Sequence, residues 1–313
     1  MNLLRPGLSR FFVGCISLAL VVAARGVSAQ AIAAGTASAS PAMPSLHISP
    51  VMGFNFSIDY TAQHNSATGW ANIVTPELSY RWNRYLSADT SVPWFATLKA
   101  FVPVKTGTTT TDELESGNSL LGDTDVSGHL ELAHKDLTYL LTTSVGFSTG
   151  NTRYGLSANT TTYNITNHFD YSVGPFTPDI EIGEGDNSTL ANQTVRRIYT
   201  AVGPLANFQV GSAIDLPWNM SLDLEAYEEL PIGNQNVYGT VTTKSKKGKT
   251  VTKQVLQGTG EAEDNGFTSE LDVPLGHYVM LNGSYARSLI QGLDTASIGM
   301  TWTLRAPKIP KID

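Results

Sequence analysis

Apolar and polar residues alternate along most of this chain. In the clearest stretch, 293–304, every second residue from Ala296 to Leu304 is apolar and Thr, Ser or Gly stands between. The same alternation occurs at 50–61, 72–82, 85–103, 124–134, 137–147, 158–171, 175–184, 199–213, 217–228, 266–273 and 277–287. A period of two residues is typical of a β-strand whose two faces meet different surroundings. The pattern predicts an all-β chain of about twelve strands.

The length of these strands favours a barrel that crosses a membrane. Most stretches have about ten residues, which is the length that a tilted strand needs to span a bilayer. A sheet with open edges would leave backbone groups unpaired in hydrocarbon, so it must close on itself. We therefore predict a single antiparallel up-and-down transmembrane β-barrel. A secreted β-sandwich or β-solenoid also alternates, but its strands are seldom so uniform, and the chain shows no repeat of fixed period.

The predicted connections alternate between short and long. Tight turns are expected at 83–84, 135–136, 172–174, 214–216 and 274–276, and polar loops at 62–71, 104–123, 148–157, 185–198 and 229–265, with a brief last loop at 288–292. Outer-membrane barrels have short periplasmic turns and longer outer loops. An even number of strands then places both termini in the periplasm. Aromatic residues near the short turns are typical of an interfacial belt: Trp82, Tyr139, Tyr171, Phe176, Trp218 and Trp302.

The short turns also predict a register. If the turn at 135–136 pairs Ala133 with Thr138, His129 lies opposite Thr142 on the same face. The turn at 172–174 likewise brings His168 near Asp179. An error of one residue would turn a whole strand over, so these pairs test the assignment of faces.

The start of the chain resembles a signal peptide, with Arg5 and Arg10 before the apolar segment 11–24 and small residues up to Ala29. The alternative is a membrane anchor, but a spanning helix needs roughly 20 apolar residues, and the segment 11–24 is short for that. We predict a signal peptide over 1–29, a flexible periplasmic lead-in rich in Ala, Ser and Gly over 30–45, the barrel over 46–305 and a short tail over 306–313.

Composition narrows the possible chemistry. Cys15 is the only cysteine and leaves with the signal, so the mature chain has no disulfide or thiolate metal site. Cleavage also removes three arginines and no acid, which lowers Lys plus Arg from 20 to 17 against 27 Asp plus Glu and leaves a net charge of −10. Such a charge argues against nucleic acid as a partner. The mean hydropathy of −0.07 is far from that of a helical membrane protein.

The inward strand faces are predicted to be acidic, with few cations among them. An acidic wall in a confined space favours cations or neutral solutes over anions, although the same residues could simply hydrate a polar interior. Carboxylates two residues apart could suggest glycoside hydrolysis, and the histidines with neighbouring acids a metal site, but alternation alone produces such pairs, and we expect no cofactor or metal. The candidate lumen-lining residues are Asp59, Glu77, Arg81, Asp89, Asp125, His129, Glu131, His168, Asp170, Asp179, Glu181, Asp223, Glu225, Glu270 and Asp272.

Motifs of barrel enzymes and nucleotide-binding proteins are incomplete here. Residues 64–69 begin with His-Asn-Ser but lack the Asn-Gly of the outer-membrane phospholipase signature. Residues 248–250 resemble the end of a phosphate-binding loop without its first glycine. We therefore predict no enzyme activity. In the longest loop, the lysines between Lys244 and Lys253 suggest a hairpin whose tip contacts anionic lipopolysaccharide, or is simply solvated.

Two short motifs resemble a known family of outer-membrane proteins. Residues 121–125, Leu-Gly-Asp-Thr-Asp, are similar to a Gly-Leu-Gly-Asp lead into a strand, and 147–151, Phe-Ser-Thr-Gly-Asn, to a Pro-Thr-Gly segment in which Ser148 replaces the proline; Tyr-Gly-Leu follows at 154–156. This order and spacing resemble the family called "MetA-pathway of phenol degradation". The resemblance implies a barrel that passes or binds small organic molecules, including aromatic or apolar ones, and it supplies no catalytic residues.

Three functions follow from these features, in order of preference. The first is a passive outer-membrane channel for small organic solutes with an acidic lumen. The second is a barrel with an adhesive or structural role outside the pore. The third is an outer-membrane hydrolase.

Overall fold

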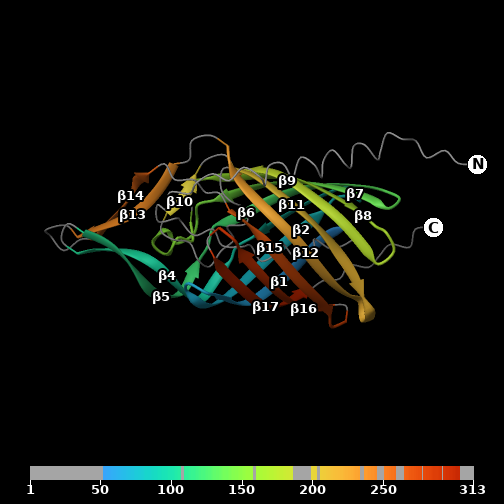
Figure 1. Ribbon diagram of the computed structural model, residues 1–313, viewed down its shortest axis with the longest axis horizontal. Helices are drawn as coiled ribbons and strands as arrows, with labels where there is room; N and C mark the ends of the chain where they lie inside the picture. Colours follow the sequence, from blue (N-terminus) through green and yellow to red (C-terminus); the bar gives the residue numbers. More distant parts are fainter. Residues whose placement is uncertain are drawn as a thin grey trace, which may run out of the picture. The chain divides into compact units, whose positions relative to one another are not determined.

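The computed structural model describes residues 52–106, 109–157, 160–185, 199–202, 205–232, 236–244, 250–258, 264–276, 278–290 and 292–303 (Figure 1). The predicted signal peptide, lead-in and C-terminal tail lie outside the described residues. Among the described residues, no helix is long and apolar enough to span a membrane.

Twelve strands form a closed antiparallel ring, which confirms the predicted barrel and shows that the sandwich alternative is wrong. Each strand pairs with its neighbours in the ring, and the last pairs with the first over Ser57 to Asn65. In order around the ring the strands are β1 (Gly53–Asn65), β2 (Gly69–Arg81), β3 (Leu86–Ser91), β6 (Thr124–His134), β7 (Leu137–Phe147), β8 (Thr162–Tyr171), β9 (Phe176–Gly185), β11 (Leu205–Leu216), β12 (Met220–Pro231), β15 (Asp264–Pro274), β16 (Val279–Ser288) and β17 (Leu293–Thr303).

The strand expected over 85–103 is divided in two. It ends as β3 at Ser91 and resumes after Pro93 as β4 (Trp94–Thr106), which pairs with β2 only over Asn72 to Val74 and then continues in a hairpin with β5 (Thr109–Leu121). Figure 1 shows this hairpin leaving the ring at one end. The polar loop predicted over 104–123 is therefore wrong, because outside the ring a strand needs no continuous apolar face.

The connection between β1 and β2 is also shorter than predicted. The loop expected over 62–71 consists of three residues, because both strands continue almost to its centre. The side chain of Asn65 accepts a hydrogen bond from Ala67 N at 2.8 Å, and Gly69 has a φ of +86°. Asn and Gly supply this turn chemistry, which we had assigned to a long loop.

The other short turns are near their predicted positions, with one shift. Between β11 and β12 the chain turns in the 3₁₀ segment η3 (Pro217–Asn219), three residues after the predicted turn at 214–216. Trp218 and Asn219 have positive φ values of 65° and 59° there.

The longer connections contain structure of their own. The 3₁₀ turn η1 (Thr152–Tyr154) follows β7. β10 (Tyr199–Val202), β13 (Asn236–Lys244) and β14 (Thr250–Gly258) form a second, three-stranded sheet in the order β10-β13-β14. The hairpin expected around the lysines is thus confirmed as β13–β14. The side chains between Lys244 and Lys253 lie outside the described part, so their contact with lipopolysaccharide stays a prediction.

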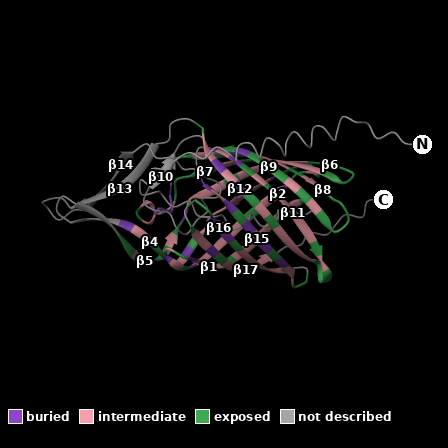
Figure 2. Ribbon diagram, viewed as in Figure 1, coloured by how far each residue is buried: buried purple, intermediate pink, exposed green. Residues whose placement is uncertain are grey.

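The two faces of the ring differ as the alternation predicts. Large apolar side chains such as Val145, Phe169 and Ile180 are exposed on one face, whereas the residues between them are buried or half-buried (Figure 2). The predicted pairs Ala133–Thr138 and His129–Thr142 are both present. Because a closed ring shields only its inside, the shielded polar face is the inward face.

Candidate functional site: the inward face of the barrel

The most deeply buried large side chains of the ring are mostly polar. Gln63 and Asn65 on β1 and Glu229 on β12 each have a relative exposure of 1%. In a water-soluble protein the apolar residues would fill this position and the polar ones would face outward. This barrel is inverted, with a polar interior and an apolar exterior. All fifteen candidate residues of the sequence analysis are buried or half-buried on described strands.

On the side formed by β2, β3 and β6, two inward acids are paired with basic side chains. Arg81 Nη2 donates to Glu131 Oε2 at 2.8 Å. The same guanidinium also donates to the backbone oxygens of Asn83, at 3.0 Å, and Arg84, at 2.6 Å, so it ties the β2–β3 turn to β6. Arg81 is 8% exposed. Its fork geometry matches several acceptors at once.

A second polar group lies beside this ion pair. His129 Nε2 is hydrogen-bonded to the carboxylate of Asp89, and its other ring nitrogen lies 3.0 Å from Thr142 Oγ1. The imidazole is therefore held at both nitrogens between β3 and β7. Such a clamped histidine contributes to the wall of the barrel, and Glu131 and Asp89 on this side each have a basic partner.

On β8 and β9 the pairing differs by two residues from the prediction. His168 lies directly opposite Glu181, and Asp170 lies opposite Asp179. The imidazole nitrogens of His168 are 3.7 Å from Glu181 Oε2 and 3.9 Å from Asp170 Oδ2. His168 and Asp179 are therefore diagonal neighbours and do not lie directly opposite each other. The reason is that the β8–β9 turn extends to Pro175, one residue beyond the predicted turn.

Four of the predicted inward carboxylates lie on the adjoining strands β12 and β15. Asp223 lies directly opposite Glu270, and Glu225 and Asp272 occupy the diagonal positions. Glu270 and Asp272 are only 3% and 4% exposed. Thr268 Oγ1 donates to Glu225 Oε2 at 3.2 Å. Among the described inward residues of the ring, Arg81 is the only Lys or Arg, and it lies on β2.

The remaining candidates lie on strands near the β1–β2 seam. Asp59 accepts hydrogen bonds from Thr301 Oγ1 at 2.8 Å and Thr61 Oγ1 at 2.7 Å. Ser91 of β3 pairs with Glu77 of β2 on one side and with Asp125 of β6 on the other. These contacts place carboxylates on the shielded face of β1, β2 and β6 as well.

Sequence reasoning missed one inward cluster, because it assigned 229–265 to a loop. Tyr227 OH donates to Asp264 Oδ2 at 3.0 Å, and Ser288 Oγ donates to Asp264 Oδ1 at 2.5 Å. Asp264 and Glu229 are opposite each other in the register and are each 1% exposed. Asp264 is an even number of residues from Glu270 and Asp272, so the alternation, extended back to residue 264, would have placed it on the same face.

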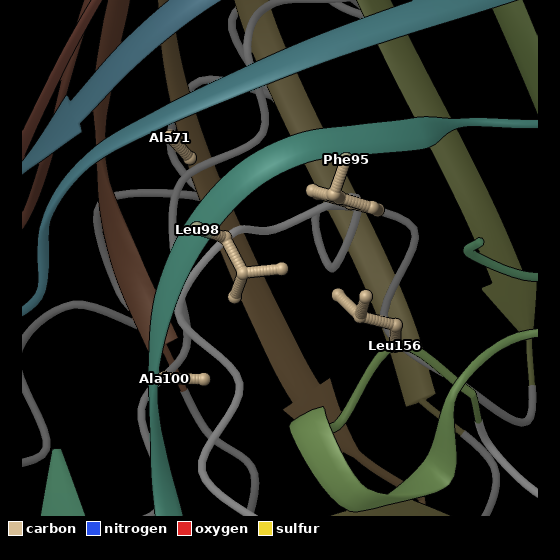
Figure 3. Close-up of a cluster of buried hydrophobic side chains, with 5 residues drawn as sticks. All are labelled: Ala71, Phe95, Leu98, Ala100 and Leu156. Carbon is tan, nitrogen blue, oxygen red and sulfur yellow. The ribbon is translucent and has the colours of Figure 1, made fainter. Parts of the chain in front are cut away.

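An apolar cluster lies near the β4–β5 hairpin, at the end where the long connections leave. Phe95, Leu98 and Ala100 of β4 contact Ala71 of β2 and Leu156 of the segment after η1, and all five are buried. Figure 3 shows the side chains of Phe95 and Leu98 directed toward Leu156. This cluster holds the connection that follows β7 against the bent part of β4.

The two motifs that carried the family resemblance lie in contact with each other. Gly150 N donates to Asp123 Oδ1 at 2.9 Å, and Asn151 N donates to Leu121 O at 2.9 Å. A Cβ on Gly150 would lie 2.2 Å from Leu156 O and 2.6 Å from Gly122 C, so only glycine fits there. The motifs thus have a structural role, since they lock the β5–β6 junction to the chain after β7.

These features define the class of protein: a closed twelve-stranded antiparallel barrel with a polar interior and an apolar exterior. The chain is similar in fold to the COG4313 outer membrane channel from Pseudomonas putida F1, with a TM-score of 0.55 and 12% identity over 81% of this chain and 96% of that one. The KdgM porin aligns with a TM-score of 0.47 and 7% identity, covering 80% and 99% of the two chains. The NanC porin aligns with a TM-score of 0.49 and 9% identity, covering 79% and 100%.

No family model and no curated protein sequence matches the chain. The resemblance to the MetA-pathway family therefore stays a prediction. The likeness to the Pseudomonas putida channel, at 12% identity, concerns the fold alone.

Proposed function

We propose that this protein is a passive outer-membrane channel for small organic solutes. The observation that carries the proposal is the inversion of the barrel. Its exterior presents apolar side chains such as Phe176, Ile182 and Ile298, each more than 40% exposed, all around a closed ring. Exposed apolar surface of this extent is typical of a membrane or protein interface, and a closed barrel is the one form of sheet that satisfies its backbone in lipid.

The orientation follows from the connections. One end of the ring has only short turns, together with the start of β1 and the end of β17, whereas the β4–β5 hairpin and all the long connections leave from the other end, beside the short β1–β2 and β16–β17 turns. In outer-membrane barrels the end with short turns faces the periplasm. The proposed location therefore has both termini on the periplasmic side, and Trp82, Tyr171 and Phe176 at the inner interface, where their side chains are exposed.

The inward charges suggest which solutes pass. Several carboxylates line the interior, and Arg81, the single inward arginine among the described residues of the ring, is already paired with Glu131. A confined wall of one charge sign raises the local concentration of the opposite sign. The proposed channel thus favours cationic and neutral organic solutes over anionic ones.

Planar-bilayer recording of the refolded mature protein tests the proposal. We expect step-like currents. In a salt gradient, the reversal potential should shift toward the equilibrium potential of the cation. Asp59→Asn together with Glu77→Gln should reduce this selectivity, whereas Asp294→Asn, which changes an outward carboxylate bound to Arg287, should not. Silent bilayers with correctly folded protein would contradict the channel and favour the adhesive or structural alternative. Turnover of an ester or glycan substrate would favour the hydrolase if the replacement of one inward carboxylate abolished it.

A further inference from the structure

We propose that the carboxylates of Asp223, Glu225, Glu270 and Asp272 form a binding site for linear polyamines, organic cations that carry several ammonium groups along an aliphatic chain. The inference deepens the proposed channel function, because it places a specific class of solute on one side of the interior. It rests on three features of the wall formed by β12 and β15: an incompletely bonded buried carboxylate, missing cations and a regular spacing.

The first feature is the environment of Glu270. Its side chain is 3% exposed, and its Oε2 has no hydrogen-bond partner among the described residues. Its neighbours on this face include the acids Asp223, which lies directly opposite, and Asp272, two residues along the same strand. A buried carboxylate with an unused acceptor carries a substantial desolvation cost. A ligand that brings positively charged N–H donors would remove that cost.

The second feature is the contrast with the opposite side of the ring. There two of the inward acids have basic partners from the chain itself, namely Arg81 for Glu131 and His129 for Asp89. The described strands β9, β11, β12, β15 and β17 contain no Lys or Arg, and the one on β16, Arg287, faces outward and bonds Asp294. A positive group for the unbonded Oε2 of Glu270 can therefore come from a solute.

The third feature is the spacing of the charges. Along one strand, residues two apart on the same face are separated by about 6.6 Å, and adjoining strands lie about 4.8 Å apart. The four carboxylates thus form an extended lattice, with Asp223 and Glu270 side by side and the other two diagonal to them. Asp179 extends this lattice, since only Gly211, which has no side chain, lies in register between Asp179 and Glu225.

This arrangement suits a chain of ammonium groups better than a single compact ion. A metal ion gathers oxygen ligands within about 2.6 Å of one point, whereas a polyamine places separate –NH₃⁺ or –NH₂⁺– groups along a line. Each primary ammonium offers three donors, and short methylene links separate the charges by distances similar to the spacing on a strand. Ala213, which lies opposite Asp223 on β11, offers the methylene groups an apolar neighbour.

Equilibrium binding of spermidine to the refolded mature barrel in detergent tests the site. We expect saturable binding by isothermal titration calorimetry. Glu270→Gln and Asp223→Asn should each weaken it about tenfold, as expected for loss of one charge-assisted hydrogen bond. Asp294→Asn is the matched control, because it removes the same charge from the outward face of β17, where Asp294 is bonded to Arg287, and it should change binding less than about twofold. Heat-modifiable migration on gels shows that each variant has folded.

Two competitors determine whether the ligand class is correct. Magnesium ion and butylamine, which has a single ammonium group, should displace spermidine only at much higher concentration. If either binds as tightly as spermidine, or if the Glu270 and Asp223 variants bind spermidine like the unchanged protein, the polyamine site is wrong. Absence of any spermidine binding would overturn it as well.

Conductance separates this inference from the proposed channel. If the protein conducts salt and spermidine blocks the current in a Glu270-dependent manner, both are supported. If bilayers stay silent while spermidine binds and Glu270→Gln weakens binding, the site stands and the channel function fails. If the protein conducts and spermidine neither binds nor blocks, the channel function stands and the site fails.

Discussion

Replacement of Arg81 tests whether the inward ion pairs stabilise the barrel. In Arg81→Gln the side chain loses its charge, the contact with Glu131 Oε2 at 2.8 Å and the two contacts with the backbone oxygens of Asn83 and Arg84. Hydrogen bonds from charged groups contribute about 1.5–3 kcal/mol each. Because Glu131 is 30% exposed, water compensates part of its loss. We expect the free energy of unfolding to fall by about 2–4 kcal/mol.

The assay is urea unfolding of the barrel in lipid vesicles, followed by tryptophan fluorescence, because Trp82 adjoins Arg81. Arg81→Lys is the matched variant. It retains the charge and lacks the planar fork, so it should recover the contact with Glu131 and lose the turn contacts, with about half the destabilisation. When Arg81→Gln is combined with Glu131→Gln, the loss of unfolding free energy should be smaller than the sum of the two single losses. The reason is that Glu131 has already lost its ion pair with Arg81 in the first variant.

A change of less than about 0.5 kcal/mol in Arg81→Gln would refute this reasoning. It would show that water in the lumen replaces the guanidinium at no cost. Additive losses in the double variant would show that Arg81 and Glu131 stabilise the barrel independently, in spite of their contact.

Two further changes test the end of the barrel where the long connections leave. Gly150→Ala forces a Cβ to within 2.2 Å of Leu156 O and should lower stability by about 2–4 kcal/mol in the same urea assay, whereas Gly128→Ala, whose Cβ meets only Thr143 Oγ1 at 3.5 Å, should have little effect. Leu98→Ala empties the centre of the apolar cluster and should release the chain after β7, so that trypsin cleaves after Arg153 several times faster; an unchanged cleavage rate would contradict the role of the cluster.

The alternation predicted most of the fold because lipid and lumen impose opposite demands on successive residues. The prediction was wrong where the chain leaves the ring, because the alternation is not required there. Residues 109–121 begin with three threonines and are mostly polar, and they form β5 beside β4 outside the ring. Pro93, which lacks a backbone N–H, marks the point at which the third strand divides. Our prediction treated it as an ordinary strand residue.

The site was predictable in its faces but only partly in its partners. Parity alone placed Glu131 and His129 on one face of β6. It could not show that β3, rather than β5, is the neighbour of β6, and that neighbour brings Asp89 to His129. The burial of Glu270 to 3% exposure was equally hidden, because it depends on side chains from several strands that meet inside a narrow ring.

The distribution of charge inside the barrel has a consequence for any solute that enters. Near β2, β3 and β6, the acids Glu131 and Asp89 are already bonded to Arg81 and His129, so the negative field there is partly cancelled. On β15, Glu270 has an Oε2 atom without a hydrogen-bond partner among the described residues; the described strands β11, β12 and β15 contain no Lys or Arg, and Arg287 on β16 faces outward. Field lines in a low-dielectric enclosure concentrate where charge is uncompensated. A cation is therefore drawn toward the β12–β15 side of the wall, and an inward lysine on β15 should reduce cation selectivity more than one on β6.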